Sequence, residues 1–112
     1  MLLKQNRLKK KTDFRRVYQR GKSLAYPSFV VYYRSSRLPE HRIGFSVSKK
    51  LGGAVERNRV KRRFREICRL HSGIFTPHTD YIFILRNPAK TAANALLEKQ
   101  IKEALSRIGG KK

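Results

Sequence analysis

The apolar positions between residues 54 and 71 recur at intervals of three and four, which is the spacing of one face of an α-helix. Gly52 and Gly53 precede this segment, and Glu56 lies where the positive end of a helix dipole favours a carboxylate. We therefore expect a helix that begins near Ala54. Its apolar face contains Val60, Phe64, Ile67, Cys68 and His71.

The same spacing predicts two more helices. Thr12 or Asp13 is expected to cap a short helix that runs from Phe14 to Arg20. A longer helix is expected over residues 91 to 108, with an apolar face made of Leu97, Ile101, Ala104, Leu105 and Ile108.

Three segments have the composition of β-strands. Residues 23 to 34 form the first, although Pro27 limits its beginning to a sheet edge or a bend. Residues 42 to 48 alternate between large apolar and small side chains, and the unbroken apolar run in residues 80 to 86 suits a central strand. We expect the first two strands to form a hairpin, and the second and third, which flank the helix at 54 to 71, to be parallel neighbours.

This order of elements predicts an α+β fold, a two-layer α-β sandwich with one mixed sheet. Two long helices would cover one face, and the short N-terminal helix would lie by the other. Residues 12 to 112 are expected to form a single domain. Residues 1 to 11 are basic and contain few apolar side chains, so we expect a flexible arm there.

Two groups of residues allow more than one interpretation. Phe14, Val17 and Tyr18 share one side of the short helix, where they either pack on the core or offer an aromatic edge to a nucleotide base. The small side chains of the second strand face either solvent or a groove beside Tyr32. These small residues are Gly44, Ser46 and Ser48.

The charge of the chain is strongly one-sided, because 28 Lys and Arg residues oppose 7 Asp and Glu residues and give a net charge of +21. A field of this sign favours phosphate polymers or anionic membranes. On the helix at 54 to 71, like charges crowd the side opposite the apolar face, where they repel one another unless an anion lies between them. We call this side the cationic face; it contains Asn58, Lys61, Arg62, Arg65 and Arg69, flanked by Arg59 and Arg63.

Membrane binding is the weaker alternative. The longest apolar runs, residues 29 to 33 and 81 to 85, are five residues each and suit strands rather than membrane spans. Polar residues follow Met1 to Leu3 directly and leave no apolar core for a signal peptide, so we expect a cytoplasmic protein. The single cysteine, Cys68, excludes an internal disulfide bond.

The chain has no recognisable active site of its own. Its acidic residues are scattered, whereas metal-dependent phosphodiester hydrolysis needs clustered carboxylates. Metal-free RNA cleavage would require an acid-base pair, for which His41, His71 and His78 are the only histidines. Cys68 and His71 alone make a poor zinc site.

Several motifs resemble the signature of the protein subunit of bacterial ribonuclease P. The run from Ser46 to Gly52, followed by Ala54-Val55 and by Arg57-Asn-Arg-Val-Lys-Arg62, carries most of the resemblance. The segments Arg7-Leu-Lys-Lys10 and Asp13-Phe-Arg-Arg-Val-Tyr18 also fit, as do Gly21 and the strand from Asp80 to Arg86. The resemblance covers nearly the whole chain.

The resemblance implies a ribonucleoprotein in which a catalytic RNA removes the 5′ leader of precursor tRNA with Mg²⁺ that the RNA and the substrate mainly hold. It implies no catalytic residue in the protein, a left-handed β-α-β crossover, and no need for a membrane or a further protein partner. The residues expected to bind the catalytic RNA are Lys49, Lys50, Arg57, Asn58, Arg59, Lys61, Arg62, Arg65 and Arg69. Those expected in the leader-binding cleft, where the small-residue face becomes the floor, are Phe14, Val17, Tyr18, Tyr32, Ser46 and Ser48.

Two other functions fit parts of the sequence. A structural RNA-binding protein, such as a ribosome-associated one, would need the same charge and the same sandwich. A stand-alone nuclease would use His71 or His78. Cleavage by the protein without RNA would identify the nuclease, and binding of ribosomal RNA without any effect on tRNA processing would identify the structural protein.

Overall fold

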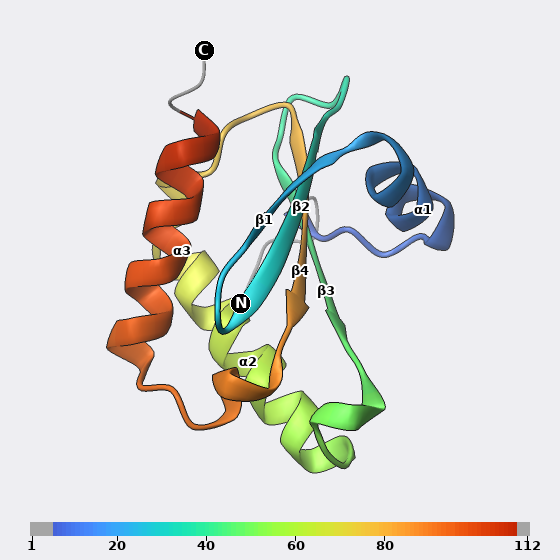
Figure 1. The fold of residues 1–112 in the computed structure, drawn as a ribbon. Coiled ribbons are helices and arrows are strands. Elements are labelled where there is room, and N and C mark those ends of the chain that lie inside the picture. The colour runs from blue at the N-terminus through green and yellow to red at the C-terminus, as the bar shows by residue number, and fades with distance from the viewer. Residues whose placement is uncertain (1–5, 110–112) are drawn as a thin grey trace.

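The computed structural model describes residues 6–109 and contains a four-stranded sheet in the order β1-β2-β4-β3 (Figure 1). β4 pairs antiparallel with β2 and parallel with β3, so the expected hairpin between β2 and β3 is wrong. The parallel pairing of the two strands that flank the long basic helix is confirmed. The strands are β1 (Lys22–Ala25), β2 (Phe29–Ser35), β3 (Arg42–Val47) and β4 (Thr79–Leu85).

The helices lie on both faces of this sheet, as predicted. Figure 1 shows α2 (Ala54–Leu70) and α3 (Asn94–Gly109) on one face and α1 (Lys11–Arg20) on the other. α2 is the crossover between the parallel strands β3 and β4. That this crossover is left-handed stays a prediction. Three short 3₁₀ helices lie in the connections, at Lys49–Leu51, Ser72–Ile74 and Asn87–Lys90.

The larger hydrophobic core lies between the sheet and the two long helices. The predicted apolar face of α2 is confirmed, because Phe64 and Cys68 are fully buried against β4 and α3. Burial raises the pKa of the Cys68 thiol. His71 lies at the rim of this core, where its Nε2 is 2.7 Å from Oε2 of Glu98 on α3.

A smaller core lies on the opposite face of the sheet, under α1. Leu8, Val17 and Ile82 are buried there, with Phe14 and Tyr32 packed against them. Because β4 places its odd-numbered apolar side chains in the larger core and Ile82 in the smaller one, it is buried on both faces. The prediction that this strand is central is confirmed.

The N-terminal segment is more ordered than the sequence led us to expect. Arg7 forms an isolated parallel bridge with Ile43 of β3, and the backbone N–H of Leu8 donates to the Ile43 carbonyl at 2.9 Å. Leu8 is only 4% exposed, since the smaller core buries its side chain. The expected flexible arm therefore does not extend through Arg7 and Leu8, whereas residues 1–5 of that prediction lie outside the described residues.

α1 begins three residues earlier than predicted, and no side chain caps its N-terminus. Asp13, one of the two expected caps, instead accepts a hydrogen bond from Nη1 of Arg42 at 3.3 Å. The same guanidinium donates from Nε and Nη2 to the carboxylate of Asp80, at 2.9 and 2.8 Å. These bonds raise the pKa of Arg42, and they tie α1 to the ends of β3 and β4.

Removing the charge of Asp80 should destabilise the fold, because its side chain is 6% exposed and the guanidinium of Arg42, which it binds through both oxygens, would lose its main anionic partner. We expect Asp80→Asn to lower the free energy of unfolding by about 3 to 5 kcal/mol, measured by urea denaturation. Glu103→Gln, at an exposed position of α3, is the matched control and should change it by less than about 0.5 kcal/mol. Equal stability of the two variants would contradict a structural role for the Arg42 bridge.

His41 should make stability dependent on pH. Its ring is stacked on Phe75 at a centroid distance of 5.0 Å, and this burial lowers the pKa of His41 below its ordinary value of 6.5. The unfolded chain therefore binds the proton more readily, so stability should fall as the pH drops from about 6.5 towards the lower folded-state pKa. We expect His41→Phe, which keeps the stack, to lose less stability than the unsubstituted protein between pH 7.5 and 5.5 in urea denaturation. An identical loss in both proteins would rule out His41 as a source of this dependence.

Candidate nucleic-acid interface

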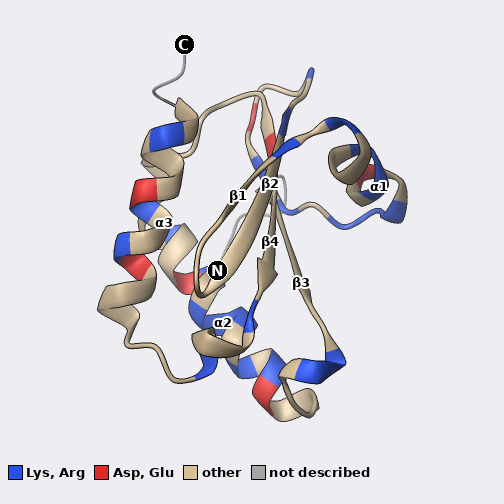
Figure 2. Ribbon diagram, viewed as in Figure 1, with Lys and Arg blue, Asp and Glu red and all other residues tan. Residues whose placement is uncertain are grey.

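The cationic face of α2 points away from the core. Asn58, Arg62 and Arg65 are exposed, and so are Arg59 and Arg69, whereas Lys61 and Arg57 are half-buried. Figure 2 shows Lys and Arg residues along most of this helix. Only two carboxylates lie on α2, and each is near a cation. Oε2 of Glu56 is 3.6 Å from Nζ of Lys90, and Oε2 of Glu66 is 2.5 Å from Nη2 of Arg69. The face thus keeps a large excess of positive charge.

The two lysines expected beside this helix are exposed in the 3₁₀ turn before it. Ser48 caps that turn, since its Oγ accepts a hydrogen bond from the backbone N–H of Lys50 at 2.9 Å. Gly52 has a φ of 153°, a conformation that favours glycine and lets the chain turn into α2. Lys49 and Lys50 are thereby held at the N-terminal end of the cationic face.

Arg63, on the flank of that face, has a different environment. Its guanidinium donates to Oδ1 of Asn94 at 2.8 Å, to the carbonyl of Ala89 at 3.0 Å and to the carbonyl of Ala92. These bonds hold the connection that leads into α3, so Arg63 is occupied within the fold. The sequence does not distinguish it from Arg62, which is exposed one position earlier.

The aromatic residues expected in the cleft come together between α1 and the sheet. Tyr18 makes edge contacts with Phe14 and Tyr32, at centroid distances of 6.3 and 5.1 Å. The Phe14 ring lies on Gly44 of β3, where a Cβ atom would be 2.5 Å from it. Glycine is therefore what allows α1 to approach this strand. We call Phe14, Tyr18 and Tyr32 the aromatic cluster.

The other predicted cleft residues are divided. Ser46 lies beside the cluster: burial raises the pKa of Tyr18, and a hydrogen bond with the Ser46 side chain partly offsets this rise. Val17 is 1% exposed and packs in the smaller core with Phe14 and Tyr32 against it. Ser48 caps the 3₁₀ turn. A role of either residue in the leader-binding cleft stays a prediction.

Cations also lie close to the aromatic cluster. A hollow of about 450 Å³ adjoins Phe14 and Tyr18, and it is bounded by Lys9, Lys11 and Arg15. A second hollow lies between the N-terminal segment and α2 and includes Arg7. Sequence reasoning missed Arg7, Lys9 and Lys11 because it assigned residues 1 to 11 to a flexible arm. The apolar Leu8, between Arg7 and Lys9, was the indication that this segment packs on the fold.

Metal-ligating side chains are scattered over the described part of the chain. Within residues 6–109, no three His, Cys, Asp or Glu side chains lie close enough together to hold a metal ion. Asp13 and Asp80, two acids that the fold brings to one place, are both bound by Arg42. These residues do not fit a protein-held magnesium ion. Among the same residues, no helix is long and apolar enough to span a membrane.

Comparison with known sequences identifies the family. The sequence model named Ribonuclease P matches residues 2–109. The chain belongs to the ribonuclease P protein family. It is 42% identical over 107 residues to the ribonuclease P protein component of Exiguobacterium sibiricum, covering 95% of this chain and 92% of that protein. It is 41% identical to the component of Staphylococcus aureus, covering 94% and 90% respectively.

Solved structures of ribonuclease P proteins have the same fold. The Staphylococcus aureus protein superposes with a TM-score of 0.81 at 39% identity, covering 93% of this chain and 94% of that one. The Thermotoga maritima protein gives a TM-score of 0.83 at 30% identity, covering 90% and 96%. The predicted family and fold class are therefore confirmed.

Arg62 and Arg63 provide a test of which cations face outward. Arg63→Ala removes several hydrogen bonds to the connection before α3, so we expect the free energy of unfolding to fall by about 2 to 3 kcal/mol. Arg62→Ala, its exposed neighbour, should change stability by less than about 0.5 kcal/mol. Both values come from urea denaturation of the protein without RNA. A larger loss for Arg62→Ala would mean that the two side chains have been assigned to the wrong roles.

Proposed function

We propose that this ribonuclease P protein binds the catalytic RNA through the cationic face of α2 and holds the 5′ leader of precursor tRNA on the aromatic cluster. The observation that carries the proposal is the separation of these two surfaces. The cations project from the helix layer on one face of the sheet, and the aromatic cluster lies under α1 on the other. One small domain can therefore contact two RNA strands at once.

The proposed leader site suits a substrate of variable sequence. Aromatic rings accept any base by stacking, and nearby cations attract phosphates without reading sequence. Tyr18 is 37% exposed, so part of its ring is accessible in the free protein. The hollow beside it offers Lys11 and Arg15 for the leader backbone.

We assign magnesium to the RNA and the substrate rather than to the protein. The role of the protein is then electrostatic: its cations reduce the repulsion between two RNA molecules, which lowers the concentration of Mg²⁺ needed for processing. Binding of the leader raises substrate affinity and leaves the chemical step to the RNA. His71 bonds Glu98, and Nδ1 of His78 is 2.8 Å from the Leu38 carbonyl, so each ring has a contact within the fold.

Reconstitution tests the proposed function. The purified protein alone should leave precursor tRNA intact, and mixing it with the matching catalytic RNA should give 5′ processing at a magnesium concentration at which the RNA alone is slow. Cleavage by the protein alone would support the nuclease alternative. Binding to ribosomal RNA with no effect on processing would support a structural RNA-binding protein.

Substitutions on the two surfaces should have separable effects. We expect Arg59→Ala to weaken assembly with the catalytic RNA and to reduce its salt dependence by about one counterion. Tyr18→Ala should leave assembly unchanged but weaken binding of precursor tRNA with a long leader, by about 1 to 3 kcal/mol. Equilibrium binding to the catalytic RNA, and then to substrates with long and absent leaders, measures both effects. If Tyr18→Ala weakens both substrates equally, the aromatic cluster is not the leader site.

A further inference from the structure

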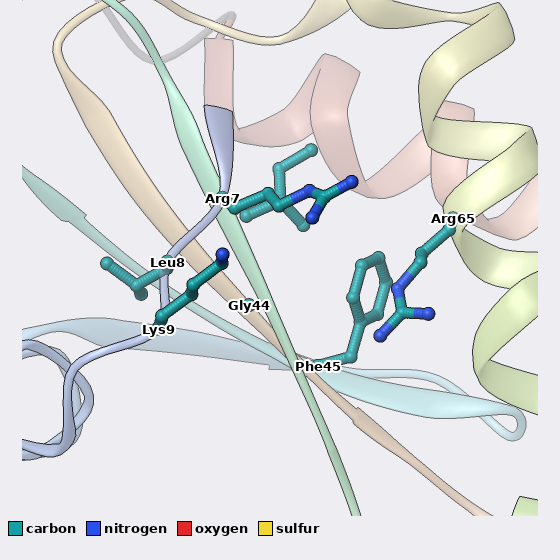
Figure 3. A pocket seen from close by; sticks show the side chains of 7 residues that line it. Arg7, Leu8, Lys9, Gly44, Phe45 and Arg65 are labelled. Carbon is teal, nitrogen blue, oxygen red and sulfur yellow. The ribbon is translucent and has the colours of Figure 1, made fainter. Parts of the chain in front are cut away.

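The hollow between the N-terminal segment, β3 and α2 combines positive charge with a fixed shape. It has a volume of about 290 Å³ and is bounded by Arg7, Lys9 and Arg65, with Phe45 and the backbone around Gly44 as its floor. Figure 3 shows Arg7 and Lys9 reaching in from the N-terminal segment and Arg65 from α2, with the Phe45 ring between them. Residues nearly 60 positions apart in the sequence thus share one hollow.

The N-terminal wall is fixed by the sheet edge. The bridge between Arg7 and Ile43 aligns the segment with β3, and burial of Leu8 in the smaller core holds it there. In an extended segment, neighbouring side chains point to opposite sides. Since Leu8 points under α1, Arg7 is directed to the other side, towards α2. Lys9 borders both this hollow and the one beside Phe14.

The second wall is fixed by an aromatic contact. The Cζ atom of Arg65 lies 5.9 Å from the centroid of the Phe45 ring, within the range of a cation-π interaction. Phe45 is itself held by stacking on Phe83 of β4, at a centroid distance of 5.8 Å. A guanidinium on this support loses less side-chain freedom when it binds a ligand than a freely rotating one.

The three cations of this hollow have no anionic partner in the described part of the chain. Among residues 6–109, Arg7, Lys9 and Arg65 make no ion pair or side-chain hydrogen bond with a carboxylate, and no acidic residue lines the hollow. Other arginines of the fold are used internally, as Arg42 and Arg63 are. Cations that are held close together without a counterion favour a ligand with concentrated negative charge.

We propose that this hollow binds a phosphodiester group of the catalytic RNA, with Arg7, Lys9 and Arg65 as its ligands and Phe45 as the residue that positions Arg65. The proposal rests on the proposed function and adds the N-terminal segment to the RNA-binding surface. The catalytic RNA is the source because the hollow adjoins α2, whereas the aromatic cluster lies across the sheet under α1. A phosphate there joins the N-terminal segment to the cationic face.

A double-mutant cycle tests the shared phosphate. We expect Arg7→Ala to weaken binding of the catalytic RNA about tenfold at low salt, and to lower the slope of log K against log salt by about one. Arg65 would bind the same phosphate. The fold loss of affinity in the double variant Arg7→Ala/Arg65→Ala should therefore be smaller than the product of the fold losses in the two single variants. Phe45→Leu, which keeps an apolar side chain, should weaken binding less than Arg65→Ala does.

Lys102→Ala, an exposed cation on α3, is the matched control for removal of one charge. The shared site is wrong if the Arg7→Ala variant binds the catalytic RNA with the same affinity as the Lys102→Ala variant. It is also wrong if the affinity loss of the double variant equals the product of the losses of Arg7→Ala and Arg65→Ala. Failure of the unsubstituted protein to bind the catalytic RNA would instead overturn the proposed function. The two failures are therefore distinguishable.

Cross-linking identifies which RNA occupies the hollow. The native Cys68 is fully buried, so a thiol introduced by Arg7→Cys, in the hollow but away from the aromatic cluster, can be labelled selectively with a photoactivatable reagent. In the reconstituted ribonucleoprotein with bound precursor tRNA, we expect cross-links to the catalytic RNA. Cross-links confined to the precursor tRNA, or no cross-link to either RNA, would overturn the assignment.

Discussion

The two hydrophobic cores are built on opposite faces of a single strand, β4. Its odd-numbered apolar residues meet α2 and α3, while Ile82 meets α1 and Leu8. Because one strand supports both layers, a shift of its register would exchange the side chains of the two cores and destroy both. The cationic face and the aromatic cluster therefore keep a fixed separation, as the proposed binding of two RNA strands requires.

The few carboxylates are used in a way that preserves the positive field. Asp13 and Asp80 are both bound by Arg42, and Glu98 is bonded to His71. These acids therefore serve to join secondary-structure elements. Most of the 28 basic residues have no such partner available, since only 7 acids exist. The folded protein accordingly carries internal repulsion that a bound polyanion relieves, which couples its stability to RNA binding.

The sequence predicted well those features that depend on the spacing of residues close together in the chain. Helical spacing located α2 and α3 within a few residues, and the unbroken apolar run identified β4 as central. Strand pairing was not predictable in the same way, because β2 and β3 are close in sequence yet both pair with β4, which comes after α2. Local spacing also could not separate Arg62 from Arg63, or show that Val17 is covered, since these differences arise only when distant elements pack together.

The order of strands also determines how the protein can fold as it is synthesised. The partner strand of β3 is β4, which begins at Thr79, after the whole of α2. Until that residue has left the ribosome, β3 has no partner strand and the apolar side of α2 lacks β4, the strand that joins β2 to β3. The cationic segment of α2 therefore emerges among ribosomal RNA before its apolar side can be fully covered, and the emergence of β4 completes the sheet.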